Sequence, residues 1–129
     1  MRKALIGINP YDFQRKGSTW NATKQAYYQA VWNVDACPVT LNHTKDLDQL
    51  ESLVSNLDGL LMVGGPDIPA NKYLSTNPHL LDEDVMSESR ESFDRALFLE
   101  GMKQDKKILA ICAGAVSYTH LRAHETIPD

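Results

Sequence analysis

The sequence has few cysteines, no long apolar run and no surplus of basic side chains. Its 129 residues include only two cysteines, Cys37 and Cys112, too few for the disulfide framework of a small secreted domain. The apolar runs fall far short of the roughly 20 residues that a membrane-spanning helix needs. The apolar stretch after Arg2 and Lys3 is also too short for the core of a signal peptide. We therefore expect a cytoplasmic protein with reduced thiols and no membrane insertion.

The charge balance excludes another class of partner. Lysine and arginine number 13 against 17 aspartate and glutamate, a formal net charge of −4. A nucleic-acid-binding domain normally carries a basic surplus on one face, so we expect neither nucleic acid nor an anionic membrane as a partner. Glycine and proline usage is ordinary, and 43% hydrophobic residues are enough for a folded core. Oligomeric state is left open by these numbers.

Four short apolar runs predict buried strands, at residues 4–8, 37–41, 59–63 and 108–111. Such runs are typical of a parallel sheet covered on both faces. Apolar residues at helical spacing predict three helices between them: one from Asn21 as the cap, one over Leu47–Leu57, and one opening at Ser87 or Ser89. Two polar stretches, 11–19 and 68–84, are expected to be loops. The alternation predicts an α/β protein with a mainly parallel sheet between helical layers.

Two features follow strands of this predicted sheet, where open parallel sheets place their sites. Cys112 comes directly after the fourth strand, between small neighbours in the sequence AICAG of residues 110–114. A nucleophile on a sharp strand-to-helix turn needs such neighbours, although a buried structural cysteine fits the spacing equally well. The third strand runs into Gly64 and Gly65. Glycines at this place let a backbone N–H come close to a substrate oxyanion. A tight turn with no further role explains them equally simply.

The order of several segments resembles one family. These segments are GLLMVGGPDIP (59–69) with Tyr73, FDRAL (93–97), KILAICAG (107–114) and KALIGI (3–8). Together they are similar to the class I glutamine amidotransferase superfamily, and within it to the gamma-glutamyl hydrolase-like branch, peptidase family C26. The resemblance covers about residues 3–115. It implies a flavodoxin-like three-layer α/β sandwich, which this chain would leave truncated after the nucleophile turn.

The resemblance also implies a site and a reaction. Cys112 would be the nucleophile that attacks a small gamma-glutamyl amide substrate, with the backbone N–H groups of Gly65 and Ala113 binding the oxyanion. No cofactor and no metal is implied. Two positions depart from the pattern: Ala113 stands where this branch often has arginine, and Ala110 stands where many members have glycine. The first change keeps the N–H donor but loses a side-chain contact with substrate.

The last residues do not continue the family pattern. Members carry the base histidine and its acidic partner far downstream of the cysteine, whereas this chain ends 17 residues after Cys112. Residues 116–129 resemble translated sequencing-adaptor read-through, so we expect residues 1–115 to be the amino-terminal half of the domain. His120 and His124 in this tail lack a convincing third metal ligand. His43 and His79 are interpreted as solvated loop histidines.

Three functions remain open at this point. The first is a cysteine hydrolase of gamma-glutamyl amide bonds, inactive in this chain because the histidine and acidic members of the triad are missing. The second is the glutaminase domain of an amidotransferase, which would pass ammonia to a synthetase partner. The third is a non-catalytic flavodoxin-like binding module in which Cys112 is structural. The exposed edge and uncovered face of a sheet that stops at its fourth strand would favour association.

Overall fold

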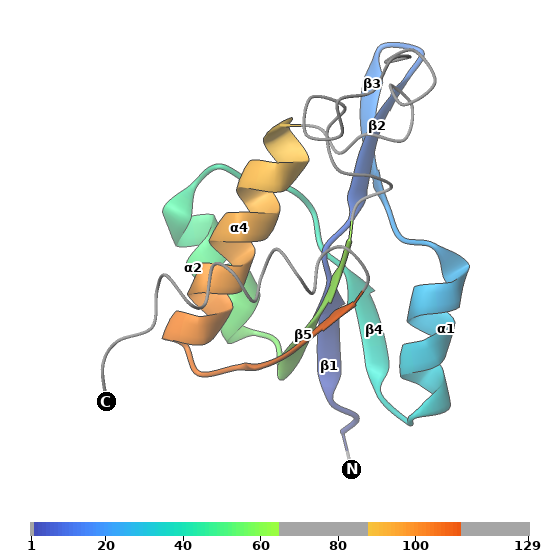
Figure 1. Cartoon of the computed structure of the whole chain (residues 1–129), viewed down its shortest axis with the longest axis vertical. Coiled ribbons are helices and arrows are strands. Elements are labelled where there is room, and N and C mark those ends of the chain that lie inside the picture. The colour runs from blue at the N-terminus through green and yellow to red at the C-terminus, as the bar shows by residue number, and fades with distance from the viewer. Residues whose placement is uncertain (1, 65–87, 112–129) are drawn as a thin grey trace, which may run out of the picture.

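The computed structural model describes residues 2–64 and 88–111. They form a four-stranded sheet of order β4-β1-β5-β6, in which every neighbouring pair is parallel, with helices on both sides (Figure 1). The elements, in chain order, are β1 (Leu5–Ile8), β2 (Tyr11–Arg15), β3 (Ser18–Ala22), α1 (Gln25–Asn33), β4 (Cys37–Thr40), α2 (Leu47–Ser55), β5 (Gly59–Val63), α4 (Glu88–Lys103) and β6 (Lys107–Ile111). The predicted three-layer α/β fold is confirmed.

The strands follow the apolar runs of the sequence. All five residues of β5 are buried, as expected for an interior strand covered on both faces. β1 lies between β4 and β5 at the centre of the sheet. Pro38 is tolerated in β4 because this strand lies at an edge, where a missing N–H costs no ladder hydrogen bond.

The helices enclose the sheet from opposite sides. One apolar cluster is formed by residues of α2, α4 and β5, among them Val54, Leu60 and Leu97. A second cluster, with Val31 and Leu61, lies on the α1 side. Figure 1 shows α2 and α4 side by side on one face and α1 across the sheet from them. Successive β–α–β crossovers of one hand produce this division.

Both the α2 and the α4 helix agree closely with the sequence prediction. The Asp46 side chain caps α2 by accepting a hydrogen bond from the Gln49 N–H at 3.0 Å, and this removes one unsatisfied donor of the first turn. In α4, Phe93 and Leu97 are buried. Gly101 brings α4 close to the sheet, because a Cβ there would lie 2.6 Å from the Leu60 Cδ1 atom.

The prediction of a loop over residues 11–19 was wrong, and so was the helix start at Asn21. Residues 11–22 form an antiparallel hairpin, β2 and β3, joined by Lys16 and Gly17. Both turn residues have positive φ, at 51° and 79°, as a two-residue hairpin turn of the right twist requires. Asn21 therefore belongs to β3, and α1 begins at Gln25.

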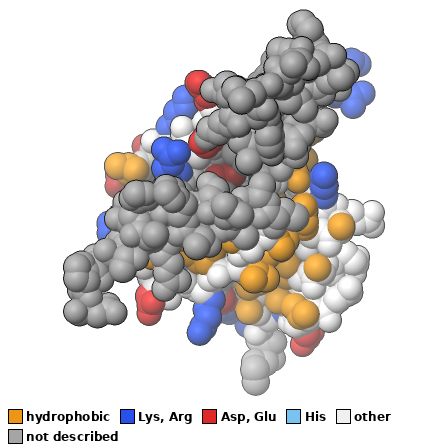
Figure 2. Space-filling view, in the orientation of Figure 1, with side chains coloured by type: hydrophobic (Ala, Val, Ile, Leu, Met, Phe, Trp, Pro, Cys, Tyr) orange, Lys and Arg blue, Asp and Glu red, His pale blue; other side chains and the backbone are white. Residues whose placement is uncertain are grey.

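Among the described residues, one face of the sheet is only partly covered beside α1. An apolar groove of about 680 Å³ runs between α1 and the strands β5 and β6, and Figure 2 shows hydrophobic side chains gathered on this face. Leu109 of β6 is 64% exposed. Within the described ranges β6 pairs with β5 alone. Across the same ranges, no helix is both long and apolar enough to span a membrane.

Candidate functional site

The strands that precede the two predicted catalytic segments are neighbours in the sheet. β5 and β6 pair in parallel, and their last residues, Val63 and Ile111, are register partners. Gly64 follows Val63 directly and is buried. Cys112, Gly65 and Ala113 themselves lie outside the described residues, as do His79, His120 and His124. The structure thus brings together the residues from which both segments start, at the carboxyl edge of the sheet.

A buried asparagine joins the end of β1 to the end of β5. Asn9 is fully buried. Its Nδ2 donates to the Val63 carbonyl at 2.9 Å, and its Oδ1 accepts from the Val63 N–H at 2.6 Å. The side chain thereby satisfies both polar groups of one backbone residue where regular strand pairing stops. Pro10, which follows Asn9, has no backbone N–H to donate.

A buried ion pair from α4 reaches the same carbonyl. Arg90 and Asp94 are 1% and 2% exposed, and Arg90 Nε donates to Asp94 Oδ2 at 3.2 Å. Arg90 Nη2 also donates to the Val63 carbonyl at 2.9 Å. Its guanidinium lies over the Tyr11 ring, 4.3 Å from the ring centre. Burying this charge is tolerable because a carboxylate, a carbonyl and an aromatic face surround it.

The hairpin is fastened to the sheet edge by polar contacts. Asp12 Oδ2 accepts from the Ser89 hydroxyl at 2.7 Å, which connects β2 to the first turn of α4. Asn21 Oδ1 accepts from the His43 N–H at 3.0 Å, which connects β3 to the segment after β4. These contacts hold the hairpin above the carboxyl ends of the strands.

His43 was predicted to be a solvated loop histidine, and this prediction was wrong. Its side chain is 17% exposed and its ring packs against Phe93, with centroids 4.6 Å apart. Its Nδ1 lies 3.9 Å from Asp12 Oδ2. Burial lowers the pKa of His43; Asp12 opposes this shift, and Arg90 adds to it. We expect a neutral imidazole near pH 7.

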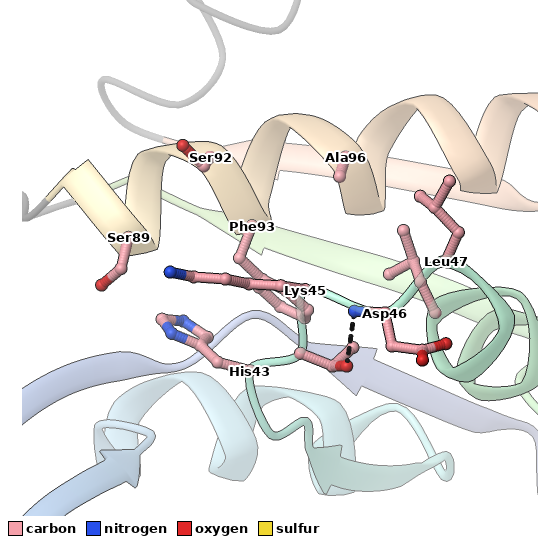
Figure 3. A pocket seen from close by; sticks show the side chains of 10 residues that line it. His43, Lys45, Asp46, Leu47, Ser89, Ser92, Phe93 and Ala96 are labelled. Atoms are coloured by element: carbon pink, nitrogen blue, oxygen red, sulfur yellow. Dashed lines mark hydrogen bonds between the residues drawn. The ribbon is translucent and has the colours of Figure 1, made fainter.

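A cavity of about 420 Å³ lies beside His43, between the amino-terminal ends of α2 and α4 (Figure 3). Phe93 and Ala96 form part of its apolar wall, and Ser89 and Lys45 contribute polar groups. The described residues that line it come from α2, α4 and the segment between β4 and α2. The cavity therefore lies on the side of the sheet that α2 and α4 cover.

The described cysteine and acidic side chains do not form a metal site. No group of three or more His, Cys, Asp or Glu residues suited to a metal ion occurs within residues 2–64 and 88–111. Cys37 of β4 is a free, partly buried thiol. Cys37 lies in the edge strand β4. No hydrogen bond among the described residues joins it to Val63 or to the residues beside Val63.

The sequence prediction missed Asn9, Tyr11, Arg90 and Asp94. One signal was present: arginine and aspartate stand four residues apart and flank Phe93, which places them on the buried side of an amphipathic helix. Asn9, directly after an apolar strand, was interpreted only as the end of that strand. Tyr11 was assigned to a loop.

Comparison with known proteins assigns the family. The sequence pattern described as Peptidase C26 matches residues 4–117. The protein NtpR of Enterococcus hirae is 30% identical over 116 residues, which cover 85% of this chain and 47% of NtpR. This chain thus spans about half the length of that relative. With the parallel sheet and the paired ends of β5 and β6, these matches show that the chain belongs to the peptidase C26 family of the class I glutamine amidotransferase-like superfamily.

Proposed function

We propose that the protein is a cysteine hydrolase that cleaves gamma-glutamyl amide bonds of small molecules. The observation that carries the proposal is the register of β5 and β6, which pairs Val63 with Ile111. One peptide bond beyond Ile111 is Cys112, and two beyond Val63 is Gly65. In a parallel sheet, segments that leave paired residues at the carboxyl edge start side by side. A nucleophile and an oxyanion donor need this proximity.

The reaction follows from these groups. The Cys112 thiolate attacks the carbonyl carbon of the amide, and the N–H groups of Gly65 and Ala113 bind the negative oxygen of the tetrahedral intermediate. Collapse of the intermediate breaks the C–N bond, and the amine leaves with a proton from a histidine. Water then hydrolyses the gamma-glutamyl thioester and regenerates the thiol.

The histidine and its acidic partner are proposed to lie in polypeptide that residues 1–129 do not contain. The relative NtpR is about twice as long as its matched segment. Residues 1–115 would then be the amino-terminal half of the catalytic domain, and residues 116–129 would not be part of it. A thiol with an oxyanion site but no general base lacks its activation step, so we expect no turnover from the 129-residue chain alone.

Thiol chemistry and substrate cleavage test the proposal in the full-length protein. We expect Cys112→Ala to abolish hydrolysis of a gamma-glutamyl anilide, whereas Cys37→Ala, the matched control, keeps wild-type activity. Cys112 should also react with iodoacetamide faster than free cysteine near neutral pH, because an activated thiol is partly ionised. A Cys112→Ala protein with unchanged hydrolysis would refute the proposal. Cleavage of glutamine alone would instead identify a glutaminase.

A further inference from the structure

The cavity between α2 and α4 has two chemically different ends. Its volume is about 420 Å³, within the range of pockets that hold small molecules. Figure 3 shows the side chains of His43, Lys45 and Ser89 together at one end, whereas Leu47 and Ala96 lie toward the other. All of these residues belong to the part of the chain that the structure describes. The cavity is therefore polar at one end and apolar at the other.

Lys45 supplies the charge of the polar end. Its side chain is exposed, and its ammonium group forms no ion pair with any residue that the structure describes. The neighbouring Asp46 points away from this ammonium in Figure 3, and its carboxylate caps α2 by accepting from the Gln49 N–H. An ammonium group without a carboxylate partner favours an anionic ligand.

His43 and Ser89, at the same end, carry no charge near neutral pH. Burial lowers the pKa of His43, so its imidazole is neutral near pH 7. The Ser89 hydroxyl donates to Asp12, and Asp12 is not among the described residues that line the cavity. Recognition of an anion at this end therefore depends on Lys45.

The apolar end favours an organic ligand over an inorganic ion. Leu50 and Phe93, which line the cavity, are each 4% exposed and form a fixed apolar wall. Leu47 is 75% exposed, so a ligand chain that packs against it removes apolar surface from water. A phosphate or sulfate ion would gain nothing from this wall, whereas an aliphatic chain would.

We propose that this cavity binds a small aliphatic carboxylic acid, with the carboxylate at Lys45 and the chain against Leu47, Phe93 and Ala96. The inference goes beyond the proposed hydrolysis and does not depend on it. A few placed polar groups beside an apolar wall are the usual composition of a small-molecule site.

Titration of the 129-residue chain with hexanoate tests the inference. In a ¹H–¹⁵N spectrum, hexanoate should shift the amide resonances of residues 43–47 and 89–96 until they saturate. A dissociation constant on the order of 1 mM is expected of so small a ligand. Hexan-1-ol keeps the chain without the charge, and acetate keeps the carboxylate with almost no chain. Each should bind at least about fivefold more weakly than hexanoate.

Two lysine variants test the polar end. Lys45→Met removes the ammonium group and keeps an apolar side chain, so it should weaken hexanoate binding about threefold to tenfold and leave hexan-1-ol binding unchanged. Lys103→Met is the matched control, because Lys103 is also exposed but lies in the last turn of α4, away from the cavity. It should change neither affinity.

A third variant tests the apolar end. Ala96→Leu occupies space that the ligand chain would fill, so it should weaken hexanoate binding about tenfold and leave acetate binding unchanged. If circular dichroism shows that this variant is misfolded, the two lysine variants still decide.

Three results would overturn the inference. Shifts that do not saturate, or that lie on α1 and β6 instead, would place the ligand elsewhere. Lys45→Met protein that binds hexanoate as wild type does would refute recognition of the carboxylate. Hexan-1-ol that binds as tightly as hexanoate would show that the cavity is an apolar patch without specificity for an acid.

Discussion

Replacing Asn9 with alanine removes both hydrogen bonds by which one side chain joins β1 to β5. The Val63 carbonyl keeps its bond from Arg90, so it loses one of two partners, worth about 1 kcal/mol. The Val63 N–H loses the Asn9 acceptor while buried, which costs about 1–3 kcal/mol. The two effects predict that the free energy of unfolding falls by about 2–4 kcal/mol, a large part of the 5–15 kcal/mol typical of a domain.

Urea unfolding followed by circular dichroism measures this change. Asn42→Ala is the matched control, because Asn42 is exposed, and a surface change of this kind stays within about 0.5 kcal/mol. Asn9→Asp separates the two bonds: its carboxylate still accepts from the Val63 N–H but cannot donate to the carbonyl. We expect this variant to be destabilised as well. If Asn9→Ala unfolds at the same urea concentration as wild type, the two hydrogen bonds do not stabilise the sheet edge and the reasoning is wrong.

Three further predictions concern pH and surface. Burial lowers the pKa of His43, so the folded state resists protonation; stability should be complete above pH 6.5, the ordinary value, and should fall as the pH drops through it. His43→Gln should flatten this fall between pH 8 and 5, and parallel curves would contradict the assignment. The hydrogen bond from Arg2 lowers the pKa of Asp58. The contribution of the ionised Asp58 to the stability of the fold should therefore be complete above pH 3.8, the ordinary value, and should be lost as the pH falls through the lowered pKa. Asp58→Asn should remove this part of the acid unfolding transition in a pH titration. Leu109→Lys should reduce self-association in light scattering and leave the urea midpoint unchanged, because Leu109 is 64% exposed; unchanged association would show that this face is not responsible.

The parallel sheet could be predicted because its signal is local. Apolar runs such as residues 59–63 identify buried strands without knowledge of their neighbours. The hairpin was missed for a physical reason. Residues 11–22 are mostly polar, and their turn is Lys16-Gly17 rather than the asparagine–glycine pair that marks such turns. Its β-forming side chains, including Phe13 and Trp20, pair across the strands, and only this pairing organises the segment.

The polar residues at the sheet edge could not be predicted because their burial depends on distant segments. His43 is covered by Phe93, 50 positions later. Arg90 meets Val63 and Tyr11 only after α4 packs against β5. In contrast, Cys112, Gly65 and Ala113 were chosen from a motif, and they stay a prediction because they lie beyond the described residues.

The central place of β1 also bears on how the protein forms during synthesis. β1 leaves the ribosome before both of its partners, which are β4, beginning at Cys37, and β5, beginning at Gly59. Chains fold from the amino terminus as they are made, at about 5–20 residues per second. The apolar residues of β1 therefore stay without a sheet for several seconds. Asn9 finds its acceptor only when Val63 has emerged. Apolar segments that have not yet met their partners are prone to aggregate, so we expect a chaperone that binds short apolar segments to act on β1 in this interval.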